Sequence, residues 1–167
     1  ISNNNFLKDL FCIYIPNEEA AIARFILAYQ AIEYYMAEMC DIKIQEIISD
    51  YKDGKLSKND YFERVKDIGG ERQQIHYIFE GIKREHPSVN NFKDDCLSLF
   101  AAINYDRKKV DVPDLFYDFR NLLVHDYRKI MSNKELVCQA IQSFELLVVY
   151  ICNNIDILNT RLRIKQM

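Results

Sequence analysis

The sequence predicts an all-α protein, an up-and-down or nearly up-and-down helical bundle of about five to six helices, two of them long. Apolar residues recur every three to four positions over most of the 167-residue chain, and helix start and stop residues separate these segments. The chain has 49% hydrophobic residues but only four Gly and three Pro, which is typical of a compact helical protein. This length and composition predict a single domain over residues 1–167, and the Ile1 start allows for a piece of a longer protein.

The first predicted helix is long, and a shorter one follows it. Pro16 and Gly54 are start and stop signals around a segment that could reach about 50 Å as one helix. Ser57 with Asp60 is typical of a helix N-terminus, and the glycines at 69–70 end this second helix. The apolar stripe of the long helix comprises Ile22, Phe25, Tyr29, Ile32, Met36 and Met39.

The middle of the chain predicts two more helices, separated by a proline. Residues 71–86 form the third helix, which Pro87 stops, and residues 88–103 form the fourth, with Ser88 as its cap. The polar and charged residues 104–114 interrupt the helical period and contain a proline. They therefore predict a loop.

Two helices complete the bundle. Residues 114–130 predict an amphipathic helix, and a capping box from Ser132 to Glu135 opens the last helix, which continues to about residue 163. The apolar stripe of that last helix comprises Ala140, Phe144, Leu147, Ile151, Ile155, Leu158 and Leu162.

Composition and charge disfavour several classes of protein. The net charge of −3 does not indicate an extended nucleic-acid-binding surface, so any basic site must be local. No apolar run approaches the roughly 20 residues that a membrane span requires. The cysteines are odd in number and contain no Cys-x-x-Cys pair, so they predict free thiols in the cytoplasm and no metal site or cofactor. They are Cys12, Cys40, Cys96, Cys138 and Cys152.

One polar pair lies on the otherwise apolar helix 114–130. Arg120 and His125 are five residues apart, which separates them by roughly 140° around the helix and about 7.5 Å along it. A long arginine side chain can still swing toward the histidine. Asn121 precedes His125 by four residues, so its side-chain oxygen can accept from a ring nitrogen and fix the tautomer. This arrangement predicts a site at the edge of a groove beside the core.

An arginine with a histidine, and no carboxylate metal ligands, favours chemistry on a phosphodiester. A neutral imidazole can take the proton of a ribose 2′-hydroxyl, and a guanidinium can bind the phosphate and stabilise the charge that develops on it. Transesterification to a 2′,3′-cyclic phosphate needs no metal, but it also needs an acid for the 5′-leaving oxygen. A two-fold dimer would supply two such histidines and two arginines across one cleft.

The stretch RNLLVHDY at 120–127 resembles the Arg-x4-His-x-Tyr motif of the HEPN superfamily, in its form with Asn directly after Arg. The stretch RFILAYQAIEYY at 24–35 is similar to the Tyr-x-x-(Ile/Leu)-Glu pattern on the first long helix of that family. The resemblance implies a metal-independent endoribonuclease that acts on RNA as a homodimer with one composite site. It also implies a role in a toxin–antitoxin system or in antiviral defence.

The resemblance assigns roles to individual residues. Arg120 and His125 would be the catalytic pair, and Asn121 would support them. Tyr127 matches the tyrosine that a partner nucleotidyltransferase, acting as antitoxin, modifies with AMP in one branch of the family. Glu33 is a weaker match to the acidic residue of the first helix.

Other interpretations of these residues stay open. His125 can be an ordinary histidine at the edge of the bundle, and Arg120 can simply pair with Asp118 or Asp126. His76 is expected at the edge of the core, and His86 is expected to cap a helix end in solvent. Among the basic residues Arg107, Lys108, Lys109 and Arg128, the loop residues are either solvated or part of a phosphate-contacting patch. The corresponding alternative function is a non-catalytic domain for dimerisation, or for binding a nucleotide or a protein partner.

Overall fold

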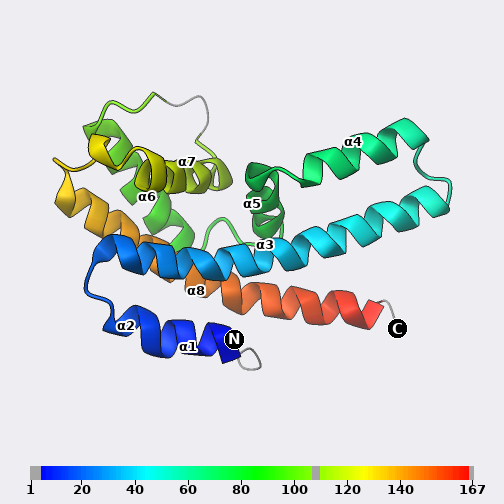
Figure 1. Cartoon of the computed structure of the whole chain (residues 1–167), viewed down its shortest axis with the longest axis horizontal. Coiled ribbons are helices and arrows are strands. Elements are labelled where there is room, and N and C mark those ends of the chain that lie inside the picture. The colour runs from blue at the N-terminus through cyan, green and yellow to red at the C-terminus, as the bar shows by residue number, and fades with distance from the viewer. Residues whose placement is uncertain (1–4, 107–109, 166–167) are drawn as a thin grey trace.

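The fold is all-α, as predicted, with no strand among residues 5–106 and 110–165, which the computed structural model describes (Figure 1). Side chains are described as far as Asn154. The main helices are α3 (Ala21–Lys52), α4 (Lys58–Ile68), α5 (Glu71–Phe79), α6 (Pro87–Ala102), α7 (Val112–His125) and α8 (Lys134–Lys165). They follow an N-terminal run of α1 (Asn5–Asp9), the π-helical turn η1 (Leu10–Tyr14) and α2 (Ile15–Asn17). With that run counted as one helix, the described residues form seven helices rather than five to six.

The additional helix is the N-terminal run, which the apolar pattern did not predict. Leu7, Leu10 and Ile15 are its buried residues, and the last spacing of five does not fit one face of an α-helix. The π-helical turn between Leu10 and Ile15 accommodates the extra residue and returns Ile15 to the buried side. The periodicity of a regular helix is therefore broken at the point where the π-turn lies.

The two long helices were predicted correctly, and they lie side by side and run in the same direction (Figure 1). The Phe25 and Phe144 rings have centroids 4.7 Å apart across this contact, and the Tyr35 hydroxyl lies 3.5 Å from the Cys152 carbonyl oxygen. Consecutive elements from the N-terminal run to α4 do alternate in direction (Figure 1). In a simple up-and-down bundle each helix reverses the direction of the one before it, so two helices separated by four others would be antiparallel. Because α3 and α8 are separated by four helices but run parallel, the order departs from this simple arrangement.

Several helix boundaries differ from the predicted ones. The long helix begins at Ala21 rather than Pro16, because the extended backbone of Glu18 separates α2 from α3 and its carboxylate accepts from the Ala20 amide at 2.8 Å. Helix α5 ends at Phe79 instead of continuing to Pro87. The predicted capping box of Ser57 and Asp60 is present at the start of α4.

Pro87 opens α6 rather than only ending the helix before it. The extended backbone of His86 makes this histidine the N-cap, where its Nδ1 accepts from the Ser88 amide at 3.2 Å, so Ser88 is not the cap. The His86 ring also stacks on Tyr150 of α8, with ring centroids 3.6 Å apart and an angle of 3°. His86 does cap a helix end as predicted, but it is half-buried rather than surrounded by solvent.

The buried side chains form one core, and Phe144 of α8 lies at its centre. The rings of Phe25 from α3, Phe92 from α6 and Phe116 from α7 lie 4.7, 5.9 and 4.9 Å from its ring, measured between centroids. The predicted stripe of α3 faces this core, with Ile22 alone only half-buried. In α8 the predicted stripe is buried as far as Ile151, and Ile155, Leu158 and Leu162 lie outside the described side chains.

One segment of α8 has the length and composition of a membrane span. Over Lys134–Asn154 the mean hydropathy of 18 residues reaches 1.5, although the longest uninterrupted apolar run, Leu146–Cys152, is far shorter than a span requires. Half of these 18 residues are buried inside the protein, where α8 packs against α3 and α6. The core helix of a soluble protein passes the same test, so this segment is weak evidence for a membrane span.

Candidate functional site

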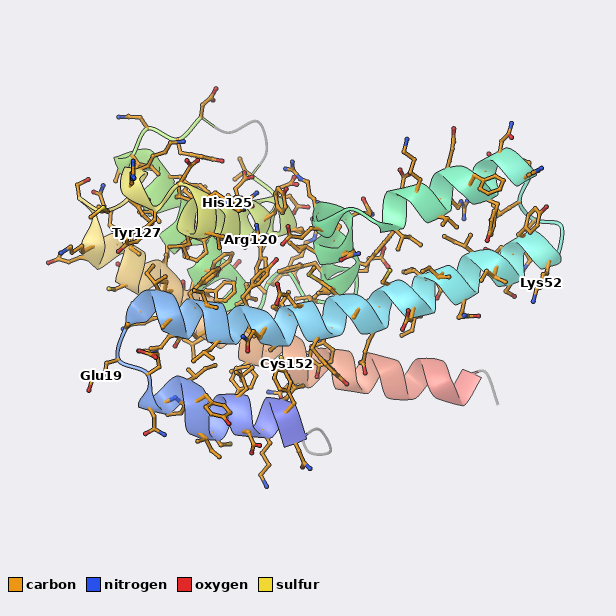
Figure 2. All side chains as sticks on the ribbon, in the orientation of Figure 1. Glu19, Lys52, Arg120, His125, Tyr127 and Cys152 are labelled. Carbon is orange, nitrogen blue, oxygen red and sulfur yellow. The ribbon has the colours of Figure 1, made fainter. Side chains whose placement is uncertain are left out.

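The Arg–His pair lies at the C-terminal end of α7. Asp111 caps the first turn of this helix through its carboxylate, with Pro113 in that turn, and the helix ends at His125 instead of continuing to residue 130. A short 3₁₀ turn, η2 (Tyr127–Lys129), follows. Arg120 is half-buried and His125 is exposed (Figure 2). The buried face of α7 packs on the core, so the pair stands at the edge of the bundle.

The Arg120 side chain extends around the helix to His125, and the sequence had indicated that it is long enough to do so. Its Nη1 lies 3.0 Å from His125 Nε2 and donates to Asn121 Oδ1, also at 3.0 Å. On its other side, Arg120 Nε lies 3.2 Å from Glu71 Oε1, which is an ion-pair distance, although the buried Nε–H makes no well-directed hydrogen bond. Glu71, rather than Asp118 or Asp126, is therefore the acidic residue that the structure places beside Arg120.

The contact with Arg120 defines the hydrogen-bonding role of His125 Nε2. A guanidinium donates hydrogen bonds and cannot accept them, so Nε2 of the imidazole is the acceptor in this contact. The contact therefore occupies the lone pair of the ring nitrogen that faces Arg120.

Tyr29 and Glu71 complete the site, and neither was predicted as a site residue. The Tyr29 hydroxyl donates to Glu71 Oε1 at 2.6 Å, and the Arg120 guanidinium carbon lies 5.7 Å from the centre of the Tyr29 ring. Burial, followed by the hydrogen bond and the charge of Glu71, raises the pKa of Tyr29 well above its usual value. In the sequence Tyr29 belongs to an apolar stripe and Glu71 to the acidic start of a helix, so no spacing relates either residue to Arg120.

The remaining predicted residues have different positions. Asn121 contacts Arg120 rather than orienting His125 directly. Glu33 is exposed one turn beyond Tyr29 on α3, and Arg128 is exposed in η2. Tyr127 is exposed in the same turn, just beyond the end of α7 (Figure 2). The predicted basic residues Arg107, Lys108 and Lys109 lie outside the described residues.

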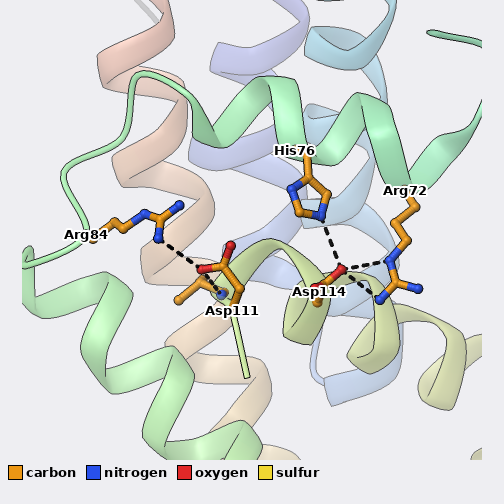
Figure 3. Close-up of polar contacts among 6 residues, drawn as sticks. Arg72, His76, Arg84, Asp111 and Asp114 are labelled. Carbon is orange, nitrogen blue, oxygen red and sulfur yellow. Dashed lines mark hydrogen bonds and ion pairs between the residues drawn. The ribbon is translucent and has the colours of Figure 1, made fainter. Parts of the chain in front are cut away.

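A second polar cluster joins the start of α7 to α5 (Figure 3). Asp114 is 1% exposed, and its Oδ1 lies 2.7 Å from both Nε and Nη2 of Arg72 and 3.1 Å from His76 Nε2. The Arg72 guanidinium also lies 5.4 Å from the centre of the Tyr117 ring. His76 is therefore a satisfied histidine at the edge of the core, as predicted, and the cluster ties α5 to α7.

Asp114→Asn is expected to lower the free energy of unfolding at pH 7 by about 2 kcal/mol, and the melting temperature by about 4–8 °C. This loss is smaller than for a fully buried pair because Arg72 is half exposed to solvent. Burial alone would raise the pKa of Asp114, but the bonds from His76 and Arg72 hold this pKa below its usual value.

The same pKa shift gives the stability a pH dependence. A carboxyl group whose pKa is lower in the folded state stabilises the protein above its unfolded pKa of about 3.9, and this contribution disappears as the pH falls through the folded value. Thermal unfolding between pH 7 and pH 2 should therefore show a smaller acid-induced loss for Asp114→Asn than for the wild type. Asp94→Asn, at an exposed position of α6, is the control. Equal curves for all three proteins would contradict the prediction.

Two surface depressions lie away from the Arg–His pair. One, of about 330 Å³, lies between α6 and α8 and includes Asp94 and Gln139 in its lining, and the other, of about 300 Å³, lies between α3, α4 and α5 around Tyr77. Arg120 and His125 line neither of them. In the part of the chain that the structure describes, no three His, Cys, Asp or Glu side chains come together as metal ligands would.

The fold and the site define an all-α protein with an arginine–histidine pair near the end of a helix and a tyrosine–glutamate pair beside it. In comparisons with protein-family models, curated proteins and solved structures, no match to this chain was found. The HEPN resemblance therefore rests on the motif and on the compatible helical architecture.

Proposed function

We propose that this protein is a metal-independent endoribonuclease of the HEPN type, active as a homodimer. The observation that carries the proposal is the 3.0 Å contact between Arg120 Nη1 and His125 Nε2 at the edge of the bundle. It brings a phosphate-binding cation and a potential proton acceptor together on one helix, with His125 open to solvent.

The reaction would be an internal transesterification of RNA. The 2′-oxygen attacks the adjacent phosphorus, and the bond from phosphorus to the 5′-oxygen breaks, leaving a 2′,3′-cyclic phosphate and a 5′-hydroxyl. His125 of one protomer takes the 2′-hydroxyl proton, and a protonated His125 of the second protomer donates a proton to the leaving 5′-oxygen. Arg120 stabilises the negative charge that develops on the phosphate.

The resting contact implies an order of events. While Arg120 donates to His125 Nε2, the lone pair of that nitrogen is occupied and cannot accept a proton from substrate. A phosphate that draws Nη1 away from His125 therefore frees the base at the moment when substrate arrives. Substrate binding and activation of the base are thus coupled through one guanidinium.

The resemblance also suggests a biological setting for this activity. We place the protein in the cytoplasm, as a toxin or an antiviral effector. Tyr127 is exposed just beyond the Arg–His pair, so a nucleotidyltransferase antitoxin could reach its hydroxyl. Transfer of AMP from ATP to that hydroxyl, with release of pyrophosphate, would add a bulky anion beside the site and block access by RNA.

The direct test uses the wild-type protein with single-stranded RNA in EDTA. We expect cleavage in the absence of free divalent metal, products with cyclic phosphate ends, and no cleavage of an oligonucleotide of the same sequence with 2′-deoxyribose. A rate that rises with the square of protein concentration in the low range would indicate that the dimer is the active form. Cleavage only after a metal is restored, or cleavage of the deoxy oligonucleotide, would contradict the mechanism.

One observation favours a second candidate, a non-catalytic domain that binds a nucleotide or a partner. Within the described residues, Arg120 is already engaged by three side chains of its own protomer. An arginine that several side chains contact in this way can serve as a stable recognition surface without chemistry. RNA or nucleotide binding with no cleavage at any protein concentration, measured in the same samples by fluorescence anisotropy, would favour this candidate.

A further inference from the structure

Behind the Arg–His pair, one carboxylate oxygen connects a buried phenol to the guanidinium. Glu71 Oε1 accepts from the Tyr29 hydroxyl at 2.6 Å and lies 3.2 Å from Arg120 Nε. These residues come from three helices, α3, α5 and α7. The guanidinium of Arg120 also lies over the Tyr29 ring.

This support is fixed from two sides. The Tyr29 side chain is 5% exposed, and its ring lies 5.8 Å from Phe25 and 6.1 Å from Phe116 between centroids, so it has little freedom to move. Glu71 is the first residue of α5, where the helix N-terminus favours a negative charge. The Glu71 carboxylate is therefore positioned by interactions other than its contact with Arg120.

An arginine without such a support would not stay near His125. The two residues are separated by roughly 140° around α7, and the rotamer entropy of a free arginine side chain favours many other orientations. The ion pair at Nε leaves Nη1 directed toward His125 and Asn121. The Nε contact thus determines where Nη1 points.

We infer that Glu71 is a positioning residue, which holds Arg120 and through it His125, and that Tyr29 fixes the Glu71 carboxylate. The catalytic consequence of this inference rests on the proposed ribonuclease function, whereas the placement of Arg120 does not. Glu71 itself touches neither phosphate nor ribose in this scheme. Its loss should therefore reduce the rate of the chemical step more than the binding of RNA.

The kinetic test compares Glu71→Gln and Tyr29→Phe with the wild type in the EDTA assay. Glu71→Gln keeps the size of the side chain but removes its charge, and we expect kcat to fall roughly 10- to 100-fold because the guanidinium is misplaced. KM should change by a smaller factor than kcat, because Arg120 acts mainly on the charge that develops in the transition state. Tyr29→Phe removes only the hydroxyl and should show a smaller fall in kcat and a KM closer to that of the wild type.

The chain offers a matched control for each variant. Glu80→Gln makes the same change just beyond α5, at an exposed residue that pairs with Lys43 at 3.1 Å. Tyr34→Phe removes another tyrosine hydroxyl of α3 that donates to a glutamate, Glu38, at 2.7 Å. Both controls are expected to keep the kinetics of the wild type, so a fall limited to Glu71→Gln and Tyr29→Phe is specific to the site.

A second measurement does not depend on cleavage. The Nε–H of Arg120 is buried, so its NMR signal should exchange slowly with water, and its absence from Arg120→Lys identifies it. We expect Glu71→Gln and Tyr29→Phe to shift this signal and to speed its exchange, whereas Glu80→Gln leaves it unchanged. Melting temperatures measured on the same samples separate this local change from unfolding.

The outcomes distinguish the inference from the function on which it rests. An unchanged Arg120 signal in Glu71→Gln would overturn the positioning role whether or not RNA is cut. Cleavage by the wild type with an unchanged kcat in Glu71→Gln would overturn the role in catalysis and leave the ribonuclease intact. No cleavage by any protein, with the Arg120 signal displaced only in Glu71→Gln and Tyr29→Phe, would refute the ribonuclease and retain the positioning role.

Discussion

His125→Ala is expected to reduce the rate of RNA cleavage in EDTA by about 10²- to 10⁴-fold, the range that one positioned proton-transfer group contributes. The reduction falls at the upper end if the same histidine serves as base in one protomer and as acid in the other. His125 is exposed at the last residue of α7, so its removal should leave the helical content and the melting temperature close to those of the wild type. Circular dichroism and cleavage rates on one preparation test both parts.

The control for this variant is His86→Ala, which should show the opposite behaviour. His86 caps α6 and stacks on Tyr150, so its loss should cost about 1 kcal/mol of stability, and cleavage should stay at the wild-type rate at temperatures below unfolding. Mixed dimers add a sharper test. A dimer of one wild-type and one His125→Ala protomer contains a single His125, so it should be nearly inactive if base and acid come from different protomers. Cleavage at about half the wild-type rate, as two independent sites would give, would contradict a composite site.

Phe144→Ala is expected to have the largest effect on stability, a loss of about 3–5 kcal/mol in the free energy of unfolding. Its ring is fully buried at the centre of the core, where it contacts aromatic rings from α3, α6 and α7. The cavity left by the ring cannot close without moving three helices. For a chain of this length the melting temperature should fall by roughly 6–20 °C.

Chemical denaturation by urea measures this prediction, with Leu146→Ala as the matched variant. Leu146 lies two residues further along α8, but its side chain is 59% exposed, so its truncation should change the free energy of unfolding by less than about 0.5 kcal/mol. Phe144 also packs near Tyr29, with ring centroids 6.5 Å apart, so the core variant should speed the exchange of the Arg120 Nε–H. Equal stability losses in the two variants would contradict the central position of Phe144.

The helical class, the two long helices and most of the core could be predicted from the amino-acid sequence. These features depend on the spacing of apolar residues along one helix, as in the stripe around Phe25 and Tyr29, and this spacing is a local property. The pairing of Arg120 with His125 was also predictable from local geometry, because both residues belong to one helix and the arginine side chain is long.

Helix boundaries were less predictable, since competing local interactions decide them. Pro87 is compatible with the end of one helix and with the start of the next, and the cap formed by His86 selects the start. The carboxylate of Glu18 accepts a hydrogen bond from the Ala20 amide, and α3 begins only at Ala21. A π-helical turn at Leu10–Tyr14 changed the period of the N-terminal helix, and an extra residue of this kind cannot be distinguished in a sequence from a break.

The residues that meet around the Arg–His pair could not be predicted from the sequence, because they come from different helices. Asp118 and Asp126 were the expected acidic partners of Arg120, but Glu71 is the one that reaches it, because the buried Asp114 ties α5 against α7 through Arg72 and His76. Tyr29 joins the site from a third helix. Contacts between helices depend on how the helices pack and rotate against one another, and a periodic pattern specifies only which face of each helix is buried.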